Sequence, residues 1–449
     1  MTLDEIFNTK YTENGDIAFK KISFLDELLN ILFLTEYYQK HLDEVPSLES
    51  TDMNRLFSMF IRDPRYGLGR RDLGRKLMSC TKVPFKDVIK AGRVDDLFVL
   101  DCSSVGYHIM LDYLHDEIVK GNELVKKWMP RYSSKNLMKA RYIAKYYGMN
   151  KQQYGHFIKC NTTEQKLSRH NYDEIKFEQV PSLAAIKYAK AFSTKPETKE
   201  RYAQYLSDVK AGKKDLKVST TNVYDIYKNR DKIDADLFFD KLEKISGSWI
   251  PIVDSSGSMM DSNDSYGKAV AIGHYLSKCS SYAPNKVISF SSHPQLITLG
   301  TPVKREYWGY EQWKVEPKSN SVYEKEIASM YTGDCSNTDF GAVMQLLSNL
   351  DGNMPEYLVV LSDMEFDEGS SMSKDATMQL FKSKGYNTKI VWWNLNERST
   401  TCPEIDAEGN IFMSGYNPML LKFLEVGFDG QKFLDKLLDE YEKAISAEG

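Results

Sequence analysis

The sequence predicts two domains: an all-α domain of helical repeats, followed by an α/β domain with a doubly wound, parallel sheet. Apolar residues recur at helical spacing from about residue 20 to 245, whereas continuously apolar strands alternate with amphipathic helices beyond residue 247. A length of 449 residues also exceeds what one hydrophobic core usually serves. We therefore expect an all-α domain at residues 1–245 and an α/β domain at residues 246–449.

Several stretches of the first half place apolar residues three and four positions apart, which is typical of helices. Short polar segments such as RYSSKN and CNTTEQ separate them. This succession predicts an irregular helical array, such as a solenoid of helix pairs, although no clean repeat period is visible. The polar residues 208–232 are expected to form the linker. The helical stretches are LDELLNILFLTEYYQKHL, VGYHIMLDYLHDEIV, ELVKKWM, LMKARYIAKYYGM and SLAAIKYAKAF.

In the second half, strands and helices alternate. The expected strands are SWIPIV, NKVISFS, QLITLG, EYLVVLS and TKIVWWNL, and the expected helices are KAVAIGHYLSKCS, FGAVMQLLSNL, DATMQLFKSKG and QKFLDKLLDEYEKAI. Continuously apolar strands are typical of a parallel sheet that helices cover on both faces. Ligands of such sheets bind at the carboxyl ends of the strands.

Charge divides along the chain, although the net charge of the whole is only −4. Residues 1–246 carry a net charge of +7, and residues 247–449 carry −11. A basic front half and an acidic back half predict different partners for the two halves, with chance composition as the alternative.

We expect a cytoplasmic protein. The first ten residues, MTLDEIFNTK, lack the basic start and apolar core of a signal peptide. No apolar stretch approaches the roughly 18 residues that a membrane span needs. Six scattered cysteines form no CxxC pair, which favours a reducing compartment. The seven histidines form no zinc-binding spacing, so a zinc site is not expected.

The stretch DSSGSMM, residues 254–260, directly follows an apolar strand. It is either a polar turn or a loop whose oxygens, from Asp254, Ser256 and Ser258, bind one hard cation. Gly257 is expected to let the loop turn tightly. Two further stretches favour the cation: GDCSNTDFGAV contributes Thr338, and LVVLSDMEFDEG contributes Asp363 at the end of another strand.

The order DxSGS, then Thr, then Asp resembles the metal-ion-dependent adhesion site of von Willebrand factor A domains, over about residues 247–449. The resemblance implies a Rossmann-like fold and one Mg²⁺, or another divalent cation such as Mn²⁺ or Ca²⁺. It also implies that an acidic group of a partner protein fills the open coordination position, and that Asp339 is structural. The implied ligands are Asp254, Ser256, Ser258, Thr338 and Asp363.

We expect no enzymatic activity. A catalytic serine needs a base, and the GxSxG elbow is missing from the sequence. His274 and His293 are the only histidines of the second half, and a core or helix-surface role is expected for His274. Neither a Walker loop nor GxGxxG accompanies the strands. A metal-dependent hydrolase is the enzymatic alternative.

Two basic clusters occupy the first half. Residues 55–93 contain eleven Lys and Arg, and residues 126–169 contain eleven more against Glu164 alone, with tyrosines interleaved. Cations that neutralise phosphates, beside rings that stack on unpaired bases, predict binding of single-stranded or structured RNA. The alternatives are a solvated helix face and, for Arg62 and Asp63, pairing with each other inside the fold.

The stretches IRDPRYGLGRRDLGRKLM and AGRVDDLF resemble the TROVE-type module of Ro autoantigen proteins. The chain resembles more closely a family built on a domain of unknown function with the same layout, and the stretch ARYIAKYYGMNKQQYGHF supports this closer resemblance. The resemblance implies HEAT-like helical repeats closed by a von Willebrand A domain, and binding of small noncoding or misfolded RNAs with single-stranded ends. The candidate RNA-binding residues are Arg62, Arg65, Arg70, Arg71, Lys135, Lys139, Arg141 and Lys145.

These observations favour a non-enzymatic, Ro-like RNA-binding protein that docks a partner through a divalent cation. A structural or assembly protein is the alternative, such as a component of a viral particle, in which case the location would be the virion. About 245 residues are few for a complete Ro ring, so an open arc is the alternative to a closed one.

Overall fold

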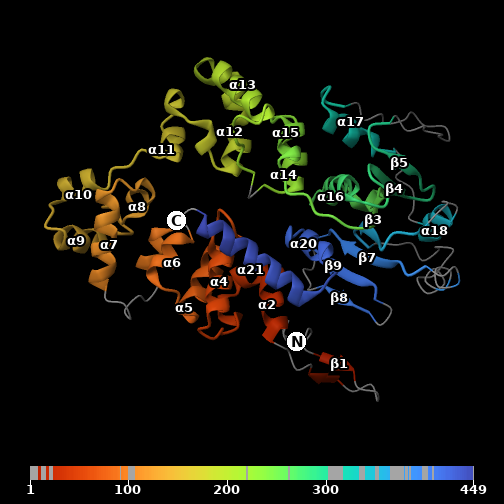
Figure 1. Ribbon diagram of the computed structural model, residues 1–449, viewed down its shortest axis with the longest axis horizontal. Helices are drawn as coiled ribbons and strands as arrows, with labels where there is room; N and C mark the ends of the chain where they lie inside the picture. Colours follow the sequence, from red (N-terminus) through yellow and green to blue (C-terminus); the bar gives the residue numbers. More distant parts are fainter. Residues whose placement is uncertain are drawn as a thin grey trace. The chain divides into compact units, whose positions relative to one another are not determined.

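The computed structural model describes most of the chain, and the structural statements below concern these residues. They are residues 9–11, 17–19, 24–91, 93–99, 107–218, 221–260, 263–301, 317–332, 339–348, 353–364, 379, 383, 386–396, 403–406 and 409–447. The chain forms two compact units, which can be followed by colour in Figure 1. Unit 1 comprises residues 1–160 and 422–449, and unit 2 comprises residues 161–421.

Unit 1 is mostly helical. Its elements are the hairpin β1 (Thr9–Tyr11) and β2 (Ile17–Phe19), and the helices α2 (Phe24–Phe33), α3 (Thr35–Lys40), α4 (Asp52–Arg62), α5 (Arg71–Cys80), α6 (Phe85–Lys90), α7 (Tyr107–Val119), α8 (Glu123–Trp128), α9 (Leu137–Tyr146), α10 (Lys151–Phe157) and α21 (Gly430–Ser446). The helix α20 (Met419–Glu425) spans the boundary with unit 2.

The C-terminal helix α21 belongs to unit 1, because its apolar face packs on α2 and α4. The ring of Phe433 stacks on Phe33 with centroids 5.8 Å apart, and Tyr441 meets Phe60 edge to face at 5.5 Å. The Tyr441 hydroxyl also donates to the buried carboxylate of Asp63. The last helix therefore returns to the first ones and belongs to the same compact unit, while residues 161–245 belong to the unit that contains the sheet.

Unit 2 combines helices with a sheet. Its helices are α11 (Thr163–Ser168), α12 (Ser182–Thr194), α13 (Pro196–Lys210), α14 (Val223–Asn229), α15 (Ala235–Asp240), α16 (Ser265–Cys279), α17 (Val322–Ser329) and α18 (Phe340–Ser348). Its strands are β3 (Trp249–Asp254), β4 (Lys286–Phe290), β5 (Leu296–Thr298), β6 (Tyr357–Ser362), β7 (Lys389–Asn394), β8 (Glu404–Ile405) and β9 (Ile411–Ser414). Apart from residues 379 and 383, the expected helix at 375–385 lies outside the described residues.

The strands of unit 2 form one sheet in the order β5-β4-β3-β6-β7-β9-β8. The five central strands are parallel, whereas the edge strands β5 and β8 are antiparallel to their neighbours. The sheet is therefore mixed, and the expectation of a parallel sheet holds for its centre only. Short connections join β4 to β5 and β8 to β9, and a short connection can join only antiparallel neighbours.

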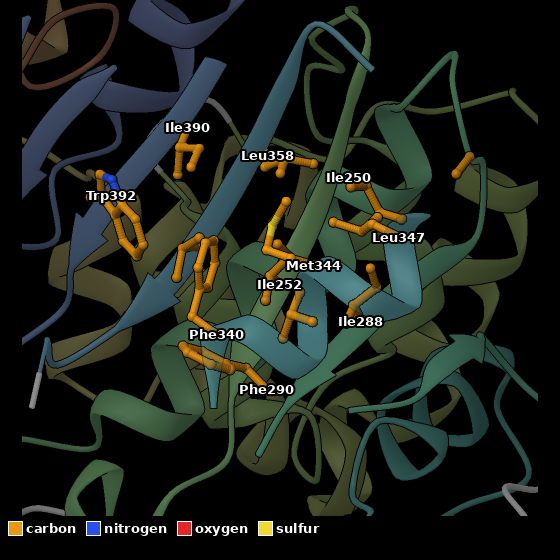
Figure 2. Close-up of a cluster of buried hydrophobic side chains, with 13 residues drawn as sticks. Ile250, Ile252, Ile288, Phe290, Phe340, Met344, Leu347, Leu358, Ile390 and Trp392 are labelled. Carbon is orange, nitrogen blue, oxygen red and sulfur yellow. The ribbon is translucent and has the colours of Figure 1, made fainter. Parts of the chain in front are cut away.

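Helices cover both faces of the sheet. On one face, Phe340 and Met344 of α18 pack against Ile252 and its neighbours on the strands (Figure 2). Successive side chains of a strand point to opposite faces, so Val253 points to the other face. There it meets α16 at Gly273, where an added Cβ would lie 2.5 Å from the Val253 side chain. The doubly wound arrangement is confirmed for these elements.

The predicted linker at residues 208–232 contains the helix α14, so this part of the prediction is wrong. Val223, Ile226 and Tyr227 lie at helical spacing and are buried, and α14 packs against α16. The hydroxyl of Tyr224 donates to Asp264, at the start of α16, over 2.8 Å. In the sequence these few apolar residues lie among many charged and polar ones, so the helical pattern is difficult to recognise.

We expect Gly273→Ala to destabilise the protein by about 1–3 kcal/mol, because the new methyl group would overlap Val253 in a packed core. Urea unfolding followed by circular dichroism would measure the change. The control is Gly257→Ala, where an added Cβ meets no atom within 4 Å, and we expect a change of less than about 0.5 kcal/mol there. Equal effects at the two positions would contradict the close packing of α16 on β3.

Candidate functional site

The carboxyl ends of β3 and β6 bring two of the predicted metal ligands together. The strands are parallel neighbours, and Val253 pairs with Leu361 in the ladder. The next residues along each strand, Asp254 and Ser362, therefore lie side by side, and Asp363 follows directly. Asp254 and Asp363 are both buried.

Asp254 is held by hydrogen bonds to both of its carboxylate oxygens. The Ser362 hydroxyl donates to Oδ2 over 2.5 Å, and the Ser256 backbone amide donates to Oδ1 over 2.9 Å. Burial raises the pKa of the Asp254 carboxyl to about 6, these hydrogen bonds lower it, and the charge of Asp363 nearby raises it again. A buried carboxylate beside a second acidic group is an environment in which a cation would be stabilised.

The two serines of the loop lie within hydrogen-bonding distance of each other. The hydroxyl oxygens of Ser256 and Ser258 are 3.0 Å apart, with Ser256 buried and Ser258 exposed. A short 3₁₀ turn, Gly257–Met259, places them there. The expected need for glycine at 257 is wrong, because its φ is not positive and open space surrounds it.

The remaining predicted ligand, Thr338, lies outside the described residues. Its neighbour Asp339 accepts a hydrogen bond from the Ala342 amide over 3.2 Å and so caps the first turn of α18, as a structural residue would. Within the described residues, no group of three or more His, Cys, Asp and Glu could hold a metal ion. The predicted site has only two carboxylates, so it depends on hydroxyls for its other donors.

This donor set fits a hard divalent cation. Asp254 and Asp363 supply carboxylate oxygens, and Ser256 and Ser258 supply hydroxyl oxygens, without nitrogen or sulfur. Mg²⁺ prefers oxygen ligands and usually takes only one or two carboxylates. Sequence reasoning missed Ser362, which orients Asp254. Its position immediately before Asp363, at the end of an apolar strand, was the available signal.

His274 lies in the core, which is one of the two roles that the sequence predicted for it. It is fully buried, and its Nε2 lies 2.8 Å from Glu326 Oε2. Burial lowers the pKa of His274. The rings of Phe239 and Tyr323 flank the imidazole.

The first basic cluster is largely paired within unit 1. Arg62 is 1% exposed, and its Nε lies 2.8 Å from Asp96 Oδ2. Arg75 holds the other oxygen of Asp96 at 2.5 Å. The prediction that Arg62 contacts RNA is therefore wrong, because its guanidinium is buried against a carboxylate. Its acidic partner is Asp96, and the proposed pairing with Asp63 is also wrong.

Three other candidates of this cluster are partly exposed and already have partners. Arg65 donates to the Lys90 carbonyl, Arg70 lies 2.5 Å from Glu36, and Arg71 lies 3.1 Å from Asp72. A phosphate would have to compete with these groups.

The candidates of the second cluster are exposed on and beside α9. Ala140, Ile143 and Ala144 form the buried face of this helix. Lys139 donates to the carbonyl of Phe98 over 2.5 Å. Among the described residues, the other three basic side chains form no ion pair with an acidic side chain. The exposed candidates are Lys135, Lys139, Arg141 and Lys145.

Aromatic rings lie beside these cations. Tyr142 and Tyr146 are exposed on α9, and their hydroxyls are hydrogen-bonded to His108 and Asp112 of α7. The imidazole of His108 stacks on Tyr146 with centroids 4.8 Å apart. The cations of α9 therefore lie beside the exposed tyrosine rings of the same helix, and α7 contributes His108 next to these rings.

Two regions of the chain are similar to families without an assigned function. Residues 248–446 match the model of a domain of unknown function (DUF7788), and residues 124–245 match that of another (DUF2828). An uncharacterised protein, L728, of Acanthamoeba polyphaga mimivirus is 22% identical over 498 residues, covering 92% of this chain and 84% of the relative.

The crystal structure of the Ro (RSR) protein of Deinococcus radiodurans aligns over 96% of this chain and 95% of its own, with a TM-score of 0.41 and 11% identity. Within the described residues, no helix has the length and apolar character needed to cross a bilayer.

We expect Arg62→Ala to destabilise unit 1 by about 3–5 kcal/mol, because it leaves the Asp96 carboxylate buried with one cation fewer. The matched control is Arg71→Ala, whose exposed pair with Asp72 should contribute about 0–1 kcal/mol. Urea unfolding of both variants would measure the difference. A loss at position 62 no larger than at position 71 would contradict the buried ion pair.

Proposed function

We propose that this chain is a cytoplasmic, non-enzymatic RNA-binding protein. In this proposal the sheet of unit 2 is a von Willebrand A-type domain that docks a partner's acidic group through a divalent cation. The observation that carries the RNA-binding part is the exposed basic face of α9, where cations without acidic partners lie beside exposed rings.

The difference between the two basic clusters supports α9 as the RNA contact. Arg70 and Arg71 each face a carboxylate, so binding a phosphate there would first break an ion pair. Arg141 and Lys145 lie one helical turn apart, are exposed and have no such competitor within the described residues. A basic side chain without an acidic partner breaks no ion pair of the protein when it binds a phosphate. Because such binding releases counterions, it is favourable and depends on salt concentration.

The geometry at the ends of β3 and β6 supports a cation in unit 2. Asp254 and Asp363 are adjacent, buried carboxylates, and Ser256 and Ser258 add hydroxyl oxygens. In the proposal these four side chains and Thr338 hold Mg²⁺, or Mn²⁺ or Ca²⁺. The bound ion would supply an electrophilic position for a carboxylate of a partner protein.

An assembly protein is the second candidate, favoured by apolar side chains on the same surface. Met138 of α9 is 75% exposed and Ile109 of α7 is 60% exposed. Exposed apolar side chains that form a contiguous patch mark contacts with another protein. The two candidates differ in what the cations of α9 do, and that difference can be measured.

The triple substitution Lys139→Ala, Arg141→Ala and Lys145→Ala should weaken binding of a labelled single-stranded RNA. The slope of log K against log salt should also fall by about 2 in magnitude, because each lost phosphate contact contributes about 0.7. Fluorescence anisotropy over a series of salt concentrations would give both quantities. RNA should also co-purify with the wild-type protein at low salt and leave it in a high-salt wash.

The control has the same net charge as the triple variant but keeps α9 intact. It combines Lys187→Ala, Lys190→Ala and Lys213→Ala, at exposed positions of unit 2. An equal loss of affinity in both triple variants would mean that overall charge, and not α9, binds RNA. A wild-type protein without salt-dependent affinity for RNA would favour the assembly protein.

Adding MgCl₂ to chelator-treated protein at pH 7.5 should raise its melting temperature, and Asp254→Asn should abolish the rise. Ligand at a hundredfold excess over its Kd stabilises by about 2.7 kcal/mol, which corresponds to a shift of several degrees. Differential scanning calorimetry would measure the shift. Asp240→Asn, an exposed acid at the end of α15, is the control and should keep the full response. A rise that survives in Asp254→Asn would refute this metal site.

A further inference from the structure

Unit 2 contains a cavity that neither the RNA surface nor the metal site uses. Its volume is about 520 Å³, within the range of small-molecule sites in proteins. One wall is formed by α13, a second by the connection from α14 to α15, and a third by the segment that precedes α17. These helices carry their labels in Figure 1.

Polar contacts hold the walls of the cavity together. Lys210 of α13 forms an ion pair with Asp234 over 2.6 Å, which joins α13 to α15. Arg230 pairs with Glu324 of α17 over 3.2 Å. Asp236 of α15 accepts hydrogen bonds from the amides of the first two residues of α17. The cavity is therefore preformed by contacts on three sides.

The charges that line the cavity are unequal. Four basic side chains face it against two acidic ones. Both acids are engaged, since Asp234 binds Lys210 and Asp236 binds the amides of α17. By contrast, Lys232 donates to the neutral side-chain oxygen of Asn229 over 3.4 Å, and within the described residues neither Lys232 nor Lys199 forms an ion pair. Two ammonium groups on different walls therefore have no ion-pair partner within the described residues.

The remaining lining is apolar. Leu206 of α13 and Ile233 of the α14–α15 connection contribute aliphatic side chains, and Ala203 and Ala235 also line the cavity. An apolar surface beside two uncompensated cations suits a molecule with an anionic group and an apolar or aromatic body. An inorganic anion alone would leave the apolar wall unfilled.

We propose that this cavity binds a small organic phosphate. A phosphate monoester carries a charge of about −1.5 to −2 at pH 7, which matches the two ammonium groups of Lys199 and Lys232. The organic part packs against Leu206 and Ile233. This site is independent of the RNA contact on α9, because the cavity is lined entirely by residues of unit 2.

Isothermal titration of the full chain with AMP tests the proposal, with adenosine as the uncharged comparison. AMP should bind saturably and adenosine should not. Lys199→Ala and Lys232→Ala should each weaken AMP about tenfold, as expected for loss of one charge-assisted contact. Lys213→Ala, an exposed lysine near the end of α13 that does not line the cavity, should bind AMP like wild type.

A second variant keeps every charge and fills the cavity. Ala203 is exposed on α13 and lines the cavity. The phenyl ring of Ala203→Phe should exclude AMP, while the melting temperature should stay close to that of the wild type. The α9 triple variant should keep wild-type affinity for AMP, which separates this site from the proposed function. Equal binding of adenosine and AMP, or unchanged AMP affinity in the Lys199→Ala/Lys232→Ala double variant, would overturn the proposal.

Discussion

The parallel pairing of β3 with β6 is the constraint on which the candidate metal site depends. The ladder aligns Val253 with Leu361, so the acids that follow the two strands arrive at the same edge of the sheet. Helices on both faces keep water from the strands, and Asp254 is therefore buried with its charge. Ser362 and the Ser256 amide offset part of that cost by donating to its carboxylate. The part of this cost that the hydrogen bonds do not offset favours binding of a cation beside Asp254.

A second interaction, between Arg62, Arg75 and Asp96, organises unit 1. One carboxylate receives two guanidinium groups, and α4 and α5 approach closely because Gly74 has no side chain to collide with Arg62. Gly74 is thus required by packing, and Arg62 and Arg75 by an internal ion pair. A sequence rich in arginine can reflect a buried network as well as a nucleic-acid surface.

Local patterns predicted the central elements correctly, because burial on both faces makes β3, β6 and β7 continuously apolar. Local patterns failed where contacts with residues distant in the sequence determine the structure. The two-residue strand β8 is exposed and gains its conformation only from pairing with β9, and α21 joins the first helices through contacts some 400 positions away in sequence.

The candidate sites show the same division between local and tertiary information. Spacing within one loop predicted Asp254, Ser256 and Ser258, since neighbours in sequence are neighbours in space there. Counting basic residues could not separate Arg62 from Arg141, because the partner that neutralises Arg62 lies 34 residues away. A binding surface differs from a structural cluster in the net charge that remains after ion pairs within the protein have been counted. By that measure α9 and the cavity beside α13 are two places, within the described residues, where positive charge has no ion-pair partner, and an anion there would displace water and not another side chain.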